Sequence, residues 1–171
     1  GIGYGTGKYL MERAEQTHEL SMINVIGVSN TVMPIINRMA SRGRGQIALM
    51  ASIAGFVAVT QSPSYAATKA YVKHWGEALH GRLKPFGVEV TTICPGFVQS
   101  AMTDANRFKM PFLMKTDRAV DIMVRGMEAG KVRVAFPWQI TWPLGIAIVV
   151  PSFIATRLNS LKRKPKLPPI D

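Results

Sequence analysis

The chain has 171 residues, of which 47% are hydrophobic and 18% charged, and its formal net charge at pH 7 is +11. This length suits one globular domain with a single core, and the hydrophobic content excludes a chain that is disordered throughout. The single cysteine excludes a disulfide framework, so we expect a buried structural thiol at Cys94 and an intracellular chain, either cytoplasmic or membrane-associated.

The first third of the chain predicts a loop, a long helix and a strand. Residues 1–7 resemble a phosphate-binding loop but lack the G-x-G-x-x-G spacing and a preceding strand, so we interpret them as an irregular loop. Apolar residues recur at helical spacing over 13–39, where Pro34 should bend the helix or mark its last turns. The short apolar run 46–51 is typical of a strand buried on both faces.

The rest of the chain predicts two further rounds of helix and strand. A hydroxyl cap and an early proline begin a helix over 62–84, and Pro85 and Gly87 end it. The core stripe predicted for this helix consists of Ala67, Tyr71, Trp75, Ala78 and Leu79. The later elements are a strand at 88–94, a helix at 116–129 and a strand at 132–136. Crossovers of this length join parallel strands, so right-handed β-α-β units in an open α/β sheet are expected.

The three histidines carry no predicted chemistry. His18, His74 and His80 show no ligand spacing and no pattern of carboxylate partners. We therefore interpret them as helix-surface residues and predict no metal site.

Tyr65 and Lys69 lie four residues apart in the predicted helix 62–84, so their side chains emerge on one face, one turn apart. A free tyrosine titrates near ~10, and proton exchange near neutral pH requires the phenolate to be favoured by about 3 units, or roughly 4 kcal/mol. A lysine ammonium at about 4 Å supplies a Coulomb interaction of that order before desolvation. Such pairs also arise by chance, so this spacing alone does not establish catalysis.

Three other features accompany the pair at a characteristic spacing. Ser52 follows the first strand, thirteen residues before Tyr65, while Asn24 lies in the long first helix. Pro95 and Gly96 end the second strand. In this order, the residues resemble those of the short-chain dehydrogenase/reductase family, and the resemblance covers nearly the whole chain.

The resemblance implies roles for four catalytic residues. Tyr65 would protonate a carbonyl oxygen during reduction, or take the alcohol proton during oxidation, and Ser52 would hydrogen-bond that oxygen. Lys69 would bias Tyr65 toward the phenolate and reach the ribose hydroxyls next to nicotinamide. Asn24 would hold a water that links Lys69 to solvent.

The resemblance also implies NAD or NADP as the hydride carrier. The expected cofactor-binding residues are Tyr65, Lys69, Pro95, Gly96, Val98 and Ser100. The backbone of Val98 and the hydroxyl of Ser100 would meet the nicotinamide carboxamide. Pro95 and Gly96 also end a strand and need no ligand to explain them, although ligands do bind at the carboxyl ends of parallel strands.

The family's usual domain begins with a strand and a glycine-rich turn that are not seen in this chain. The expected fold is therefore a partial Rossmann-like, doubly wound parallel sheet, forming a single domain over 1–171 with its core at about 1–136. Because half of the usual cofactor site is missing, we expect that the isolated chain neither binds cofactor tightly nor turns over. The residue that selects NAD or NADP would lie in the missing part.

Apolar residues indicate the substrate class, and the family resemblance implies the assembly. The expected substrate-site residues are Ala54, Phe56, Val59 and Met102. Together with the Met- and Phe-rich run 108–114, they predict an apolar pocket for a hydrophobic ketone or secondary alcohol, such as a lipid, steroid or retinoid. Family members usually pair the helices that bear Asn24 and Tyr65 between subunits, so a homodimer or tetramer is expected.

The C-terminal region contains 23 consecutive uncharged residues, 134–156, which is long enough to span a bilayer. Three prolines within it argue against one continuous membrane helix. We interpret 137–160 as a substrate lid and packing helix, and 161–171 as a solvated basic tail. Contact of 137–166 with a membrane surface is the alternative.

A second class of function remains open. A non-catalytic basic module that binds anionic membrane or nucleic acid would explain the positive charge and the tail, but not Ser52, Tyr65 and Lys69 together. Nucleic acid is the less expected of these partners. Within the enzyme class, an epimerase or dehydratase of the extended branch would need a larger region after Pro95 and Gly96.

Overall fold

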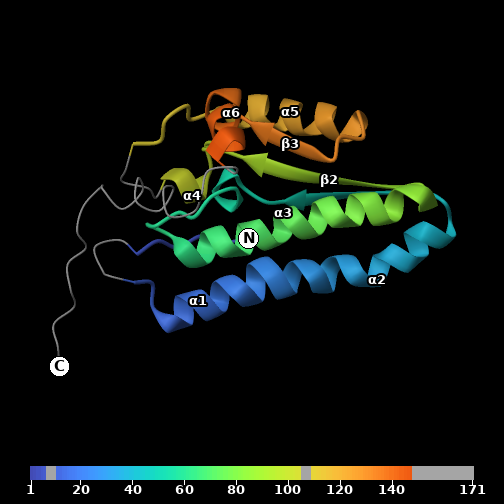
Figure 1. Ribbon diagram of the computed structural model, residues 1–171, viewed down its shortest axis with the longest axis horizontal. Coiled ribbons are helices and arrows are strands. Elements are labelled where there is room, and N and C mark those ends of the chain that lie inside the picture. Colours follow the sequence, from blue (N-terminus) through green and yellow to red (C-terminus); the bar gives the residue numbers. More distant parts are fainter. Residues whose placement is uncertain (7–10, 105–108, 148–171) are drawn as a thin grey trace.

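The computed structural model describes residues 1–6, 11–104 and 109–147 and shows the layered α/β arrangement in Figure 1. Its first helical segment is continuous: α1 (Ala14–Ser21), a π-helical turn (Met22–Gly27) and α2 (Val28–Ser41) follow one another. Pro34 lies inside α2 and does not end it. The long helix predicted over 13–39 is therefore present, with a π-helical turn that the hydrophobic spacing did not indicate.

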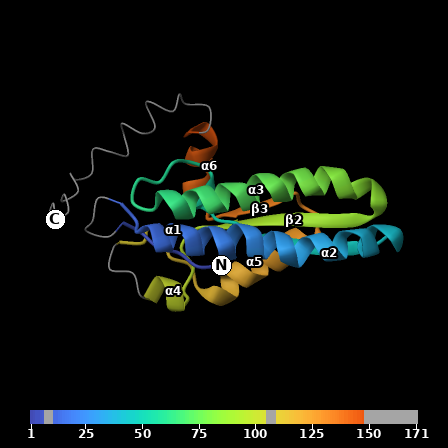
Figure 2. The same ribbon diagram turned by 90° about the horizontal axis from the view of Figure 1, so that it is seen from below.

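Within the described residues, three parallel strands form the sheet, in the order β1 (Gly45–Met50), β2 (Val88–Pro95) and β3 (Arg133–Phe136). Helix α3 (Pro63–Leu83) joins β1 to β2, and α5 (Thr116–Glu128) joins β2 to β3. Figures 1 and 2 show α1, α2 and α3 on one face of the sheet and α5 on the other. The prediction of an open, parallel, doubly wound α/β sheet is confirmed.

Four short elements complete the described structure. They are a 3-10 turn (Ile53–Gly55), a second 3-10 turn (Lys84–Phe86), α4 (Ala101–Asp104) and α6 (Trp138–Ala147). Helix α6 occupies the first part of the predicted lid and packing helix at 137–160. The rest of that segment and the predicted basic tail lie outside the described residues.

Two apolar cores lie on opposite faces of β2. Val90 and Cys94 face α2 and α3, where they pack with Val72. Ile93 belongs to the second core, which lies under α5 and includes Val134. This division follows from the alternation of side chains along a strand. Cys94 is a free cysteine without solvent exposure, so the predicted buried thiol is confirmed.

The core stripe predicted for α3 is wrong in part, although Trp75 and Leu79 do pack against the core. Ala67, Tyr71 and Ala78 are exposed, and the Tyr71 hydroxyl lies 2.9 Å from the Ser29 hydroxyl of α2. The buried residues of α3 are Ala66, Thr68, Lys69, Val72, Lys73, Gly76, His80 and Leu83. The prediction assumed that apolar side chains would face the sheet, whereas polar side chains occupy much of that face because they find partners there.

His80 illustrates the reason, and its predicted surface position is also wrong. The side chain is buried, and its Nδ1 donates a hydrogen bond of 2.8 Å to the Val90 carbonyl oxygen. His18 and His74 are exposed, as predicted. A buried backbone carbonyl can satisfy an imidazole N–H, a possibility that helical periodicity alone does not reveal.

The helical segment Ala14–Ser41 is long and apolar enough to cross a membrane, judged by length and composition. In the fold, however, it forms an outer layer: Leu20, Asn24 and Val32 are buried. Its other face exposes several large apolar side chains. Packing within an α/β domain therefore accounts for part of this apolar character, and the outer face of the segment stays exposed in the described structure.

Candidate active site

Ser52 lies just beyond the end of β1, at the carboxyl edge of the sheet. The chain is still extended at Ser52, and the serine hydroxyl accepts a hydrogen bond of 3.1 Å from the Ala54 backbone N–H. That contact begins the 3-10 turn Ile53–Gly55, and the Ser52 side chain is buried. The predicted strand-end serine is therefore held at the edge where ligands bind in open α/β sheets.

Gly55 sets the distance between the Ser52 turn and α3. A Cβ atom on Gly55 would lie 2.6 Å from the Lys69 carbonyl carbon and 2.7 Å from its oxygen. These are backbone atoms of a helix and cannot move aside separately. The turn can therefore approach α3 this closely only with glycine at this position.

Tyr65 and Lys69 occupy the first two turns of α3, on the face directed at the sheet. The Lys69 Nζ lies 5.7 Å from the centre of the Tyr65 ring and donates a hydrogen bond of 2.9 Å to the Met50 carbonyl oxygen. A side-chain hydrogen bond also links Tyr65 with Ser52. The structure thus brings Ser52, Tyr65 and Lys69 together, as the sequence predicted.

The pKa shifts differ from the simple Coulomb expectation. Burial raises the pKa of Tyr65, and the hydrogen bond with Ser52 only partly opposes this effect. Burial also lowers the pKa of Lys69, with the Cys94 thiol acting in the opposite direction. Desolvation is the larger cause of both shifts, and the raised pKa keeps the proton on Tyr65 near neutral pH.

Asn24 lies in the π-helical turn and has no solvent exposure. Its Oδ1 accepts a hydrogen bond of 2.9 Å from the Ile2 N–H, and its Nδ2 donates one of 2.8 Å to the Ile2 carbonyl oxygen. The same Nδ2 lies 3.2 Å from the Thr68 hydroxyl. A Cβ on Gly1 would lie 3.1 Å from the Lys69 Nζ, so the N-terminal segment, Asn24 and Lys69 converge.

The expected cofactor residues at the end of β2 form a well-bonded loop. The Val98 carbonyl accepts a hydrogen bond of 2.8 Å from the Thr103 hydroxyl, and the Ser100 hydroxyl lies 3.3 Å from the Thr103 hydroxyl oxygen. A Cβ on Gly96 would lie 2.9 Å from Pro137 Cδ. Packing against Pro137 therefore requires glycine at position 96, independently of any ligand.

The donors at this edge fit one end of a nicotinamide nucleotide. The Lys69 ammonium and the hydroxyls of Tyr65 and Ser100 are groups that can bind ribose hydroxyls and a carboxamide. Within residues 1–6, 11–104 and 109–147, no glycine-rich turn opens a helix to receive the diphosphate. No cluster of three or more metal-ligating side chains was found in the same residues.

The predicted substrate residues do not gather around Tyr65. Phe56 and Val59 line a cleft of about 480 Å³ beside α3, and Ser52 and Tyr65 are not among the described residues that line it. Ala54 is half-buried in the turn after Ser52. Met102 lies in α4, but its side chain is outside the described part of the chain.

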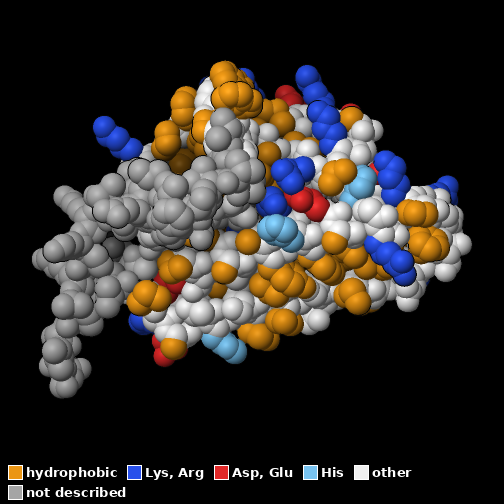
Figure 3. All heavy atoms as spheres, in the orientation of Figure 1, with side chains coloured by type: hydrophobic (Ala, Val, Ile, Leu, Met, Phe, Trp, Pro, Cys, Tyr) orange, Lys and Arg blue, Asp and Glu red, His pale blue; other side chains and the backbone are white. Residues whose placement is uncertain are grey.

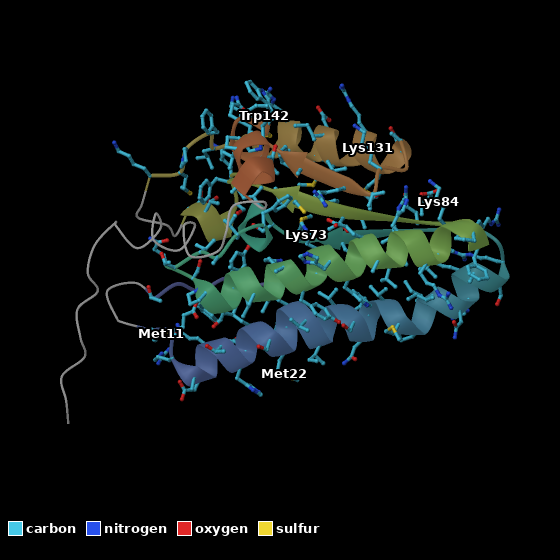
Figure 4. The ribbon with its side chains drawn as sticks, in the orientation of Figure 1. Met11, Met22, Lys73, Lys84, Lys131 and Trp142 are labelled. Atoms are coloured by element: carbon cyan, nitrogen blue, oxygen red, sulfur yellow. The ribbon has the colours of Figure 1, made fainter. Side chains whose placement is uncertain are left out.

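Phe56 instead belongs to a charged cluster between α3 and β3. Its ring lies 5.0 Å from the Lys73 Nζ and 5.2 Å from the Arg133 guanidinium carbon. Glu77 lies between the cations, 2.7 Å from Arg133 Nε and 3.7 Å from Lys73 Nζ. Figure 4 shows Lys73 directed from α3 toward the strands. This cluster holds the Ser52 turn against both α3 and β3.

Sequence reasoning missed three contributors to the site. Thr68 is buried, and its hydroxyl donates a hydrogen bond of 2.8 Å to the Tyr65 carbonyl oxygen while accepting one from the Asn24 amide. The Met50 carbonyl, which accepts from Lys69, is backbone and leaves no signal in a sequence. Gly55 was visible only as part of a small-residue turn, because its contact with α3 is a tertiary one.

Comparison with known proteins agrees with this geometry. A family model described as short chain dehydrogenase matches residues 1–110. An uncharacterized oxidoreductase of Myxococcus xanthus is 40% identical over 129 residues, covering 75% of this chain and 51% of the relative. A very-long-chain 3-oxoacyl-CoA reductase of Ajellomyces capsulatus is 31% identical over 99 residues, covering 58% of this chain and 29% of the relative. The chain thus spans about half of the first relative and less of the second.

Solved structures share the fold. A short chain dehydrogenase from Burkholderia cenocepacia in complex with NADP superposes with a TM-score of 0.75 at 20% identity, covering 92% of this chain and 68% of that one. A bulky-bulky ketone specific alcohol dehydrogenase from Comamonas testosteroni gives 0.72 at 21% identity, covering 96% and 61%. Since the family model matches more than half of the sequence, this chain belongs to the short chain dehydrogenase family.

Proposed function

We propose that the chain carries the proton-transfer residues of an NAD(P)-dependent oxidoreductase that interconverts a ketone and a secondary alcohol. The observation that carries the proposal is the contact of Tyr65 with both Ser52 and Lys69 at the carboxyl edge of the sheet. The NADP complex of the related Burkholderia cenocepacia fold supports the choice of cofactor class. Bound NAD(P)H would supply a hydride to the carbonyl carbon.

In this mechanism Tyr65 is the proton donor. During reduction its O–H bond breaks, and the proton passes to the carbonyl oxygen as that oxygen gains negative charge. The raised pKa of Tyr65 keeps the proton available at neutral pH. Ser52 hydrogen-bonds the same oxygen and orients it toward Tyr65, while Lys69 stabilises the phenolate that is left.

Proton return would pass by way of Lys69. Its Nζ lies near Gly1, which also lies close to the Asn24 amide. The Asn24 amide is bonded to the Ile2 backbone and to Thr68, so its role is to hold the opening segment against Lys69. A water bound in that segment would connect Lys69 with solvent.

The substrate is proposed to be a hydrophobic carbonyl compound. Two related proteins are named as a very-long-chain 3-oxoacyl-CoA reductase and a bulky-bulky ketone specific alcohol dehydrogenase, and both names specify a carbonyl substrate with a large substituent. Ala54, Phe56 and Val59 follow Ser52 in the chain, and Phe56 and Val59 line the apolar cleft beside α3. An intracellular setting stays a prediction.

Self-association is proposed through the outer face of α1, α2 and α3. The exposed apolar residues of this face are Met22, Ile23, Ile26, Met33, Ile35 and Tyr71. Figure 3 shows orange side chains gathered over α2 and α3. A second copy of the chain would cover an apolar area that a monomer leaves in water.

Turnover by the whole protein tests the reaction. Tyr65→Phe should lower kcat for ketone-dependent NADPH or NADH oxidation by about 10²–10⁴-fold, because phenylalanine has no proton to donate. Tyr71→Phe, in the same helix but exposed, is the matched control and should keep full activity. If Tyr65→Phe retains activity, the mechanism is wrong and a non-catalytic basic module becomes the better account.

A further inference from the structure

Two tryptophans lie on the outer surface of α6. Trp138 and Trp142 are four residues apart, so they share one face of the helix, and each side chain is 72% exposed. Figure 4 shows Trp142 at the outer rim of the molecule. Tryptophan is normally at least half-buried in a soluble domain, so two exposed rings side by side indicate a surface that is covered in use.

A second segment adds apolar residues to the same surface. Phe112 is 53% exposed and Leu113 42% exposed, and both line a cleft of about 540 Å³ together with Trp138. Phe112 has a φ of +57°, a left-handed conformation that is uncommon for an aromatic residue. Met114, which follows Leu113, is buried and forms an isolated β-bridge with Val98. This bridge holds the exposed residues in place.

Cations border these apolar side chains. Lys115 and Arg118 also line the cleft, at the start of α5, and both are exposed. In the sequence, the uncharged run 134–156 that contains α6 is followed by five cations within ten residues: Arg157, Lys162, Arg163, Lys164 and Lys166. The surface therefore combines apolar rings with positive charge, in a chain whose net charge is +11.

We propose that this surface docks onto an anionic phospholipid bilayer. Trp138, Trp142 and Phe112 enter the boundary between headgroups and acyl chains, where amphipathic aromatic rings are favoured. Lys115 and Arg118 contact lipid phosphates. A lipid surface fits better than a protein partner because the rings and cations surround a shallow cleft, and no acidic side chain is among the described residues that line it. The proposal is independent of the reaction proposed above.

Vesicle binding of the full chain tests the proposal. Sedimentation with phosphatidylcholine vesicles containing phosphatidylglycerol is compared with sedimentation with phosphatidylcholine vesicles alone. We expect partitioning to the anionic vesicles to fall more than tenfold in Trp138→Ala/Trp142→Ala and about tenfold in Lys115→Gln/Arg118→Gln. Phe86→Ala and Lys84→Gln are the matched controls. Both residues are exposed in the 3-10 turn Lys84–Phe86 that follows α3, outside the proposed docking surface, so these variants should bind as wild type does.

Fluorescence separates docking by this surface from attraction by the basic C-terminal residues. In a Trp75→Phe background only Trp138 and Trp142 report, and lipids brominated in the acyl chain should quench them and shift their emission to the blue. Sedimentation without quenching, or tryptophan variants that bind as wild type does, would show that the C-terminal cations alone bind and would overturn the proposal. Absence of sedimentation with anionic vesicles would overturn it as well and would favour a protein partner.

Discussion

Replacing Gly55 by alanine should separate the Ser52 turn from α3. The new Cβ would lie 2.6 Å from the Lys69 carbonyl carbon and 2.8 Å from the Ala70 nitrogen. To reach the 3.4 Å limit of ordinary contact, the turn must move by about 0.8 Å. Overpacking of this kind costs about 1–3 kcal/mol, and the movement would lengthen the hydrogen bond between Ser52 and Tyr65.

Urea unfolding followed by far-ultraviolet circular dichroism measures the loss of stability. Gly81→Ala is the matched control, because Gly81 lies within α3 and a Cβ there meets nothing within 4 Å. Alanine at this helical position should stabilise the fold by about 0.5–1 kcal/mol, so the two identical substitutions are expected to have opposite signs.

The activity of the whole protein gives a second measurement. A displacement close to 1 Å at a catalytic group can lower turnover by about 10²-fold, so Gly55→Ala should reduce kcat far more than Gly81→Ala does. If the free energy of unfolding of Gly55→Ala lies within ~0.5 kcal/mol of that of the wild type, the close approach to α3 does not hold the Ser52 turn in place.

Three further predictions concern the core, the charged cluster and the assembly. A thiol in an unfolded chain has a pKa near ~8.5, whereas burial raises the pKa of Cys94 in the folded chain to about 12. The buried, protonated thiol therefore contributes its full stabilisation below the unfolded pKa and loses it as the pH rises toward the folded pKa. Between these two values, the free energy of unfolding should fall by up to ~1.4 kcal/mol per pH unit relative to that of Cys94→Ala. Burial tends to raise the pKa of Glu77, but contact with Arg133 and Lys73 outweighs it and holds this pKa below its usual range. Glu77→Gln should therefore lower the free energy of unfolding by about 1–3 kcal/mol at neutral pH. Urea titrations at lower pH should show this difference disappearing as acid protonates Glu77. Ile26→Glu should reduce the mass measured by light scattering toward that of a monomer without changing the circular dichroism spectrum, and an unchanged mass would exclude the π-helical turn Met22–Gly27 from the interface.

The order of elements and most of the site residues could be predicted from local patterns. The β-branched run before Pro95 indicates a strand because branched side chains suit a pleated surface, and the prolines and glycines around α3 indicate its ends. The four-residue spacing of Tyr65 and Lys69 places both on one helical face whatever the remainder of the fold does. These features depend on residues close in sequence, so the sequence alone determined them.

The burial of polar groups could be decided only by the tertiary structure. Lys69 and His80 face the sheet because the Met50 and Val90 carbonyl oxygens accept hydrogen bonds from them. The Thr68 hydroxyl instead accepts a hydrogen bond from the Asn24 amide of the neighbouring helical segment, and all three partners come from other elements. The direction of the Tyr65 pKa shift has the same origin, since desolvation depends on what surrounds the ring. Apolar periodicity determined where the helices and strands lie in the chain, whereas long-range hydrogen bonds and close packing determined which faces turn inward.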